Sequence, residues 1–187
     1  MYRRTALIAT AAWVCGAPAL PVAAQSARTL AEQARRGGVL LIRHASTEAG
    51  VGDPAGFTLG QCHTQRNLSE AGRAEAKALG EWFQRHGLQA RAVLSSQWCR
   101  CQDTARLAFE QAQDWPALNS TFAGQGQAAA QDMALRDRLR QMPAGRMEIW
   151  VTHQVNMTAL TGAYPGLGEA FVVDRQGRLL ARGWMKT

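Results

Sequence analysis

The stretch Val39-Leu40-Leu41-Ile42-Arg43-His44-Ala45-Ser46-Thr47-Glu48 decides the fold. Its first four residues form a short continuous apolar run, which is typical of a strand buried on both faces of a parallel sheet. The run ends abruptly on a cation and an imidazole, Arg43 and His44. Ligand sites in open α/β sheets form just beyond the carboxyl ends of the strands, so this strand is expected to deliver both side chains to one site.

A second run of this kind lies near the end of the chain, where residues 147–152 lead directly into His153. Two strands that each end on a histidine predict one shared site, although the two histidines are far apart in the sequence. A third cation, Arg100, falls in the first turn of the helix expected after Ser95-Ser96. Helix N-termini present free N–H groups and a positive dipole end, so this combination indicates a phosphate-binding site.

Strand and helix patterns alternate along the chain, which predicts an α/β fold of βαβ units with a largely parallel sheet. The expected helices cover residues 27–36, 69–86, 97–111, 127–142 and 155–161. The expected strands cover residues 39–42, 92–94, 147–152, 169–174 and 178–182, with a brief further strand at 117–118. Residues 45–67 are irregular and rich in glycine, and a loop of that length in a compact domain is usually functional or mobile.

The first 24 residues have the pattern of a secretory signal peptide: Arg3 and Arg4, the apolar stretch 6–14, and small residues that end at Ala24. The apolar stretch is shorter than the roughly 20 residues that span a bilayer. Cleavage after Ala24 is therefore expected to leave one exported, periplasmic domain, residues 25–187, with no stable membrane insertion. The pattern leaves open whether export follows the general secretory or the twin-arginine route.

Cleavage removes two basic residues and no acidic one, which lowers the net charge from +7 to +5. The remaining arginines are scattered, and no dense basic run or RNA-binding motif is present. The positive charge therefore suits a phosphorylated small-molecule substrate better than a nucleic acid. Nothing in the sequence indicates an oligomeric state.

Three cysteines remain after cleavage: Cys62, Cys99 and Cys101. In an oxidising compartment one disulfide is expected, between Cys62 and either Cys99 or Cys101, and three buried thiols are the alternative. The spacing of Cys99 and Cys101 is too tight for the usual zinc motifs. We expect neither a metal nor a cofactor.

Four segments, in order, resemble the histidine phosphatase superfamily, the phosphoglycerate mutase-like proteins. They are Arg43-His44-Ala45, Asn67-Leu68-Ser69-Glu70-Ala71-Gly72-Arg73, Ser95-Ser96-Gln97-Trp98-Cys99-Arg100-Cys101-Gln102-Asp103-Thr104-Ala105, and Val151-Thr152-His153. Each match alone is weak, but together they cover most of the mature chain. The resemblance implies a three-layer αβα sandwich around a mostly parallel sheet.

The resemblance also implies a role for each matched residue. His44 would be the nucleophile that becomes a phosphohistidine, with one ring nitrogen held by a backbone carbonyl so that the other carries the lone pair. Arg43, Arg100 and His153 would surround the phosphoryl oxygens and supply the positive charge, so no metal would be required.

The sequence departs from the family pattern at the proton donor, the carboxylic acid that protonates the leaving oxygen. Gln154 stands where acid-phosphatase-like members carry an aspartate, and the region after the Arg100 helix has no carboxylate from residue 115 until Asp132. The candidates are Glu48 and Asp53, which we favour, and Asp132. A member without this acid would favour good leaving groups, such as phosphoramidates or acyl phosphates.

The sequence as a whole predicts an exported phosphatase that hydrolyses phosphate monoesters or related phosphoryl compounds through a phosphohistidine. The alternative is a phosphate-binding protein that has lost turnover because the acid is missing. The variable loops, residues 45–67 and 114–131, are expected to set the substrate, whose identity the sequence does not give.

Overall fold

The computed structural model describes residues 22–186, with side chains described from residue 29 onward. The leader expected over residues 1–24 therefore lies outside the described residues, except for positions 22–24. Those three positions begin helix α1, Val22–Arg35. No helix in the described part of the chain combines the length and apolar character needed to cross a membrane.

A six-stranded sheet forms the centre of the molecule, in the order β3-β2-β4-β1-β5-β6. The strands are β1 Gly38–Arg43, β2 Ala92–Ser95, β3 Gln113–Asp114, β4 Met147–Thr152, β5 Glu169–Val173 and β6 Leu179–Trp184. The pairs β1–β4, β2–β4 and β2–β3 are parallel, whereas β5 and β6 join the edge as an antiparallel hairpin. The sheet is mostly parallel, as the alternating pattern predicted.

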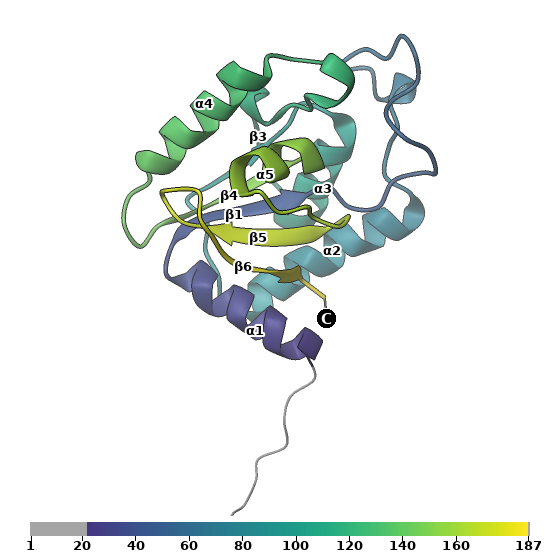
Figure 1. Cartoon of the computed structure of the whole chain (residues 1–187). Coiled ribbons are helices and arrows are strands. Elements are labelled where there is room, and N and C mark those ends of the chain that lie inside the picture. The colour runs from purple at the N-terminus through teal and green to yellow at the C-terminus, as the bar shows by residue number, and fades with distance from the viewer. Residues whose placement is uncertain (1–21, 187) are drawn as a thin grey trace, which may run out of the picture.

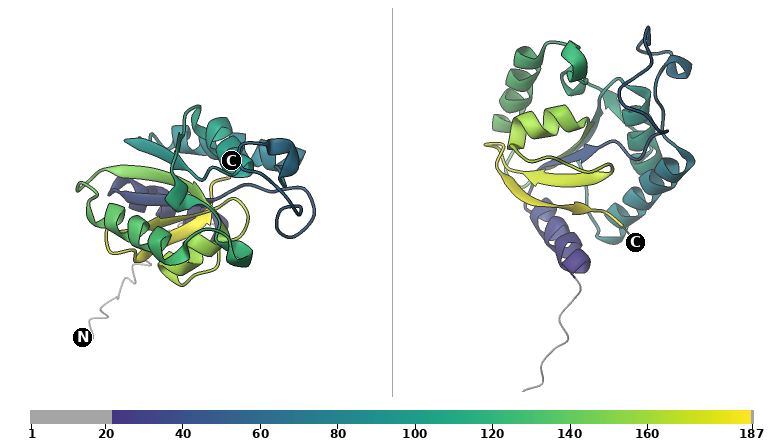
Figure 2. Two further views of the ribbon diagram at one scale, coloured as in Figure 1. Left: turned by 90° about the horizontal axis from the view of Figure 1, so that it is seen from above. Right: turned by 45° about the vertical axis from the view of Figure 1, so that its right-hand side comes forward.

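Helices cover both faces of the sheet, which makes the fold a three-layer αβα sandwich (Figures 1 and 2). Besides α1, the helices are α2 Glu70–Arg85, α3 Cys99–Phe109, α4 Ala128–Arg140 and α5 Gln154–Thr161. Helices α1, α2 and α3 pack on one face, against Leu40 and Ile42 of β1. Helices α4 and α5 pack on the other face, against Val39 and Leu41. Alternate residues of β1 thus enter two cores, which explains its unbroken apolar run.

Helix α2 begins where the sequence indicated, because the hydroxyl of Ser69 caps it by accepting a hydrogen bond from the backbone N–H of Gly72 at 3.1 Å. Gly72 also allows this helix to approach the backbone that follows His44. A Cβ at position 72 would lie 1.8 Å from the carbonyl oxygen of Ser46. The glycine is therefore required by close packing, and it fixes α2 against the end of β1.

The prediction of a strand at residues 117–118 is wrong. These residues belong to a 3-10 turn, Pro116–Leu118, and the edge strand of the sheet is β3. Pro116 has no N–H to donate to a sheet ladder. The carbonyl of Leu118 instead accepts hydrogen bonds from the side chains of Thr152 and Asn156, each at 2.8 Å.

Candidate active site

The carboxyl ends of β1 and β4 bring the two histidines together. In the register of these neighbouring strands Arg43 lies opposite Thr152, so the next residues, His44 and His153, leave the sheet side by side. Their ring centroids are 5.5 Å apart. Both histidines, together with Arg43 and Arg100, line a cavity of about 290 Å³. The four side chains expected to share one site therefore do so.

His44 is held as a neutral imidazole with a free lone pair. Its Nδ1 lies 2.9 Å from the carbonyl oxygen of Ala45, and because a carbonyl can only accept, Nδ1 carries the proton. Burial and the positive charges of Arg100, Arg43 and Arg66 lower the pKa of His44 from 6.5 to about 3. The Nε2 atom is therefore unprotonated at neutral pH, as a nucleophile requires.

His153 ends a chain of hydrogen bonds that fixes its orientation. Arg100 donates to its Nδ1 at 3.5 Å, so the proton of the neutral ring lies on Nε2, 2.8 Å from the hydroxyl of Ser96. Ser96 in turn donates to the side-chain oxygen of Asn119 at 3.1 Å. Burial, and then the charge of Arg100, holds the pKa of His153 well below its usual value. A bound anion would offset that charge and favour a protonated ring.

Three arginines contribute to the cavity: Arg43, Arg66 and Arg100. In the described part of the chain five buried side-chain nitrogen or oxygen atoms have no hydrogen-bond partner, and three of these are the Nε atoms of those arginines. Buried unpaired donors are rare in native proteins, and an ordered water or a bound ion can satisfy them. Three guanidinium groups on the lining of one cavity suit a multivalent anion.

Arg66 was missed by the sequence analysis. Its guanidinium donates to the hydroxyl of Thr47 at 2.8 Å and to the carbonyl of Gly50 at 2.9 Å, which turns it toward the end of β1. The only signal in the sequence is its place, directly before the Asn67-Leu68-Ser69 segment at the end of the long loop. Loop conformation has no periodic pattern, so the sequence did not show which loop side chain faces the site.

Asp53 is the only carboxylate among the described residues that line this cavity. It forms a two-point ion pair with Arg100, at 2.7 and 3.2 Å, and also accepts from the indole N–H of Trp98 and the backbone N–H of Arg66. Burial alone would raise the pKa of Asp53, but the hydrogen bonds and charge of Arg100 outweigh it and hold the pKa below its usual value. Asp53 is therefore ionised and occupies the fork of Arg100, that is, the two terminal nitrogens Nη1 and Nη2 of its guanidinium.

The other two candidate acids lie outside the cavity. Glu48 is exposed and follows Thr47, which forms an isolated β-bridge with Leu68. The backbone N–H of Glu48 donates to the carbonyl of Asn67. Asp132 lies on α4 and pairs with Arg136 at 2.8 Å. Neither is among the residues that line the cavity.

Comparison with known proteins identifies the family. The model of the histidine phosphatase superfamily (branch 1) matches residues 39–134, slightly more than half of the chain. The chain belongs to this superfamily. The matched range contains Arg43, His44, Asp53, Arg66 and Arg100, while His153 lies beyond it.

Solved structures share the fold of this superfamily member at low sequence identity. The protein TTHB049 from Thermus thermophilus has a TM-score of 0.56 and 20% identity, over 80% of this chain and 96% of that one. A mycobacterial glucosyl-3-phosphoglycerate phosphatase has a TM-score of 0.56 and 18% identity, over 82% and 100% of the two chains. The protein histidine phosphatase SixA, complexed with tungstate, has a TM-score of 0.51 and 15% identity, over 78% and 94%. No curated protein matches the chain.

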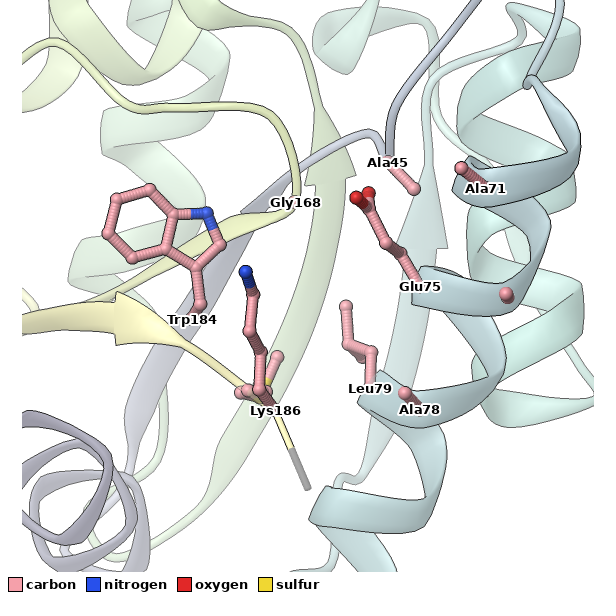
Figure 3. A pocket seen from close by; sticks show the side chains of 10 residues that line it. Ala45, Ala71, Glu75, Ala78, Leu79, Gly168, Trp184 and Lys186 are labelled. Carbon is pink, nitrogen blue, oxygen red and sulfur yellow. The ribbon is translucent and has the colours of Figure 1, made fainter. Parts of the chain in front are cut away.

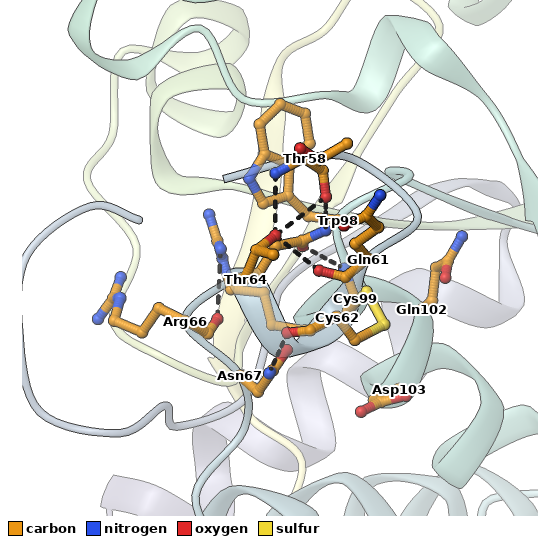
Figure 4. Close-up of a disulfide and its surroundings, with 12 residues drawn as sticks. Thr58, Gln61, Cys62, Thr64, Arg66, Asn67, Trp98, Cys99, Gln102 and Asp103 are labelled. Carbon is orange, nitrogen blue, oxygen red and sulfur yellow. Dashed lines mark hydrogen bonds between the residues drawn. A yellow bond between two sulfur atoms is a disulfide. The ribbon is translucent and has the colours of Figure 1, made fainter. Parts of the chain in front are cut away.

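A disulfide between Cys62 and Cys99 ties the long loop to the start of α3 (Figure 4). It settles which of the two expected pairings forms. Gln65 adds a second link, because its side-chain oxygen accepts from the backbone N–H of Cys99 at 3.0 Å. Arg100 follows Cys99 directly and donates to the carbonyl of Arg66 at 3.4 Å. The disulfide thus joins the loop that carries Asp53 and Arg66 to the helix that carries Arg100.

Cys101, by contrast, is a buried thiol whose Sγ lies 3.4 Å from Nε2 of His153. Burial raises its pKa to about 12, so it is protonated at neutral pH. Nucleophilic cysteines are thiolates, and Cys101 does not fit that role. Within the described residues no cluster of histidine, cysteine and carboxylate side chains could hold a metal ion.

A second cavity, of about 460 Å³, lies beside Ala45, the residue that follows His44 (Figure 3). Its lining is mostly apolar, with Glu75 and Lys186 as the charged members. Glu75 accepts hydrogen bonds from the backbone N–H and the hydroxyl of Ser46, both at 3.0 Å. This cavity contains no group suited to phosphoryl transfer, but Glu75 on its wall fixes the backbone beside His44.

Proposed function

We propose that the protein is an exported phosphatase that hydrolyses phosphate monoesters or related phosphoryl compounds through a phosphohistidine at His44. One observation carries the proposal. A neutral imidazole with a free Nε2 lone pair lines the same cavity as three guanidinium groups. Membership of the histidine phosphatase superfamily supports the same activity.

The charge of the cavity suits a phosphate group. With both histidines neutral, three guanidiniums and the Asp53 carboxylate leave a net charge of +2. A phosphate monoester carries about −1.5 to −2 at pH 7. Guanidinium groups bind phosphate oxygens through two parallel hydrogen bonds, which fixes orientation as well as charge.

The reaction then takes two steps. The Nε2 lone pair of His44 attacks phosphorus in line as the bond from phosphorus to the leaving oxygen breaks, and the arginines hold the non-bridging oxygens. Water next attacks the phosphohistidine, the phosphorus–nitrogen bond breaks and returns its electron pair to His44, and phosphate leaves. Positioning and charge stabilisation supply most of the catalysis, as is usual for phosphoryl transfer.

Asp53 is the better placed of the two favoured proton donors, since Glu48 does not line the cavity. Asp53 can act as the acid only after the substrate phosphate has displaced it from Arg100 and it has then taken up a proton, because the ion pair keeps it ionised. We therefore propose that binding of the phosphoryl group and release of Asp53 are one exchange at the fork of Arg100.

The test is a phosphatase screen of the mature protein over a panel of phosphate esters and phosphoramidates. His44→Ala should abolish turnover, whereas His63→Ala, which changes an exposed histidine outside the cavity, should leave it unchanged. The rival function, a phosphate-binding protein without turnover, is supported by the occupied fork of Arg100. It predicts phosphate binding with no hydrolysis of any substrate in the panel.

Export is the second part of the proposal. The disulfide between Cys62 and Cys99 is compatible with an oxidising compartment. We expect the full-length chain, expressed in a Gram-negative host, to accumulate in the periplasm with Gln25 as its first residue. N-terminal sequencing of the fractionated protein tests this, and an uncleaved chain in the cytoplasm would contradict it.

A further inference from the structure

The outer wall of the active-site cavity is apolar. Seven large apolar side chains are exposed in the described part of the chain, and three of them line this cavity: Val51, Phe122 and Tyr164, which are 89%, 46% and 64% exposed. Val155 and Leu167 are two further apolar residues that line the cavity. Apolar residues that gather around a pocket in this way mark a binding surface, whereas single exposed ones need no explanation.

Charge is absent from that wall. The charged residues that line the cavity are the four at the phosphate site, Arg43, Asp53, Arg66 and Arg100. The remaining polar lining residues, such as Gln125 and Gln154, are neutral. A leaving group that carried a second phosphate or a carboxylate would lose water at this wall without gaining a partner.

The apolar wall continues directly from the phosphate site. The Tyr164 ring lies 5.8 Å from the guanidinium carbon of Arg43. Phe122, which also lines the cavity, packs beside Gly52, where a Cβ would lie 3.5 Å from the ring. Ala123, which follows Phe122, has a φ of 55°, a conformation that costs a residue other than glycine free energy. Phe122 therefore begins a strained turn at the cavity.

We infer that the substrate is an aryl phosphate: a monophosphate whose leaving group is an uncharged aromatic ring packed against Phe122, Val51 and Tyr164. This inference rests on the proposed function and names its substrate class. Aromatic rings pack well against one another and against apolar side chains. A phenol also leaves as a weaker base than an aliphatic alcohol, which suits a site whose only lining carboxylate, among the described residues, is ionised.

Binding of phosphonates tests the inference without any turnover. Calorimetry should show that phenylphosphonate binds about tenfold more tightly than methylphosphonate, because the ring buries apolar surface. Phe122→Ala should reduce that ratio to about twofold, and Phe122→Tyr, which keeps the ring, should restore it. Met133→Ala, which changes an exposed apolar residue on α4 outside the cavity, should leave the ratio unchanged. Equal affinity for the two phosphonates would overturn the inference.

Kinetics separate this inference from the proposed function. We expect kcat/KM for 1-naphthyl phosphate to exceed that for glycerol 3-phosphate, and Phe122→Ala to act mainly on KM. Hydrolysis that depends on His44 but favours glycerol 3-phosphate would overturn the inference and keep the function. A tenfold preference for phenylphosphonate without hydrolysis of any ester would overturn the proposed function, and with it the claim of a substrate, and would leave only a binding site for aryl phosphates. Faster hydrolysis of a tyrosine-phosphorylated peptide than of phenyl phosphate would support the aryl assignment and place its source in a protein.

Discussion

Replacing Asp53 with asparagine should make the protein bind phosphate more tightly and fold less stably. The carboxylate now occupies the fork of Arg100 through hydrogen bonds of 2.7 and 3.2 Å, which an incoming anion must break. Asparagine has almost the same shape and keeps an oxygen that accepts from Trp98, but it carries no charge. An incoming anion would therefore no longer compete with the Asp53 carboxylate for Arg100.

The size of the effect follows from those two bonds. A hydrogen bond to a charged group contributes about 1.5–3 kcal/mol, and a neutral amide retains part of it. Without the competing carboxylate the binding free energy of phosphate or vanadate should become more favourable by about 2 kcal/mol, which corresponds to roughly 30-fold tighter binding. In the absence of anion, the buried charge of Arg100 would lose its carboxylate partner, which should lower the free energy of unfolding by about 3 kcal/mol.

Calorimetric titration with inorganic phosphate and with vanadate measures the first effect, and thermal unfolding with and without phosphate measures the second. Asp132→Asn is the matched control, because it removes a carboxylate paired with Arg136 outside the cavity. If Asp53→Asn bound phosphate no more tightly than the native protein, Asp53 would be a support for Arg100 and not a competitor. If Asp53 is also the proton donor, the variant should lose about 100-fold or more in kcat on alkyl phosphates and little on aryl phosphates.

Three further effects follow from the site. The free energy of unfolding should fall as the pH drops below about 6.5, by at most about 1.4 kcal/mol per pH unit for each of His44 and His153. The reason is that the unfolded chain takes up protons that the buried rings resist, in the case of His44 until about pH 3. Chemical denaturation at several pH values measures this. Serine at both Cys62 and Cys99 should cost about 4 kcal/mol of stability, the loop-closure value for a separation of 37 residues, and should raise KM because the loop is freed. Arg66→Met should weaken phosphate binding about 10- to 100-fold by calorimetry, with folding unchanged.

Each of these predictions has a result that opposes it. Stability that stays constant between pH 6.5 and about 4 would mean that the two rings titrate normally. An unchanged KM in the double-serine variant would mean that the disulfide holds no part of the site. For Arg66 the control is Arg73→Gln, which changes an exposed arginine paired with Asp103 at 3.3 Å; equal effects of the two variants would leave Arg66 without a special role.

The parts of the site on regular elements could be predicted from the sequence. His44 and His153 follow apolar runs, and a run that ends on a polar residue fixes where the strand stops and where that residue emerges. Arg100 follows from the same logic at a helix start. The mostly parallel sheet likewise follows from the alternating strand and helix patterns, whereas its three layers were implied by the family resemblance and its edge strand β3 was missed.

The parts on loops could not be predicted, because their positions depend on long-range contacts. Asp53 was considered as an acid, but its ion pair with Arg100 crosses 47 residues and has no local signal. The choice between Cys99 and Cys101 depended on the helix itself. Residues two apart point about 200° from each other on an α-helix, so Cys99 faces the loop while Cys101 is buried beside His153.

Trapping of the covalent intermediate tests the central claim most directly. The purified protein is mixed with an aryl phosphate labelled in its phosphoryl group, quenched in alkali within milliseconds, and mapped by mass spectrometry. We predict acid-labile label on His44 and none on His153, with no label in His44→Ala. Turnover without label on any histidine, or label that persists in His44→Ala, would contradict the account.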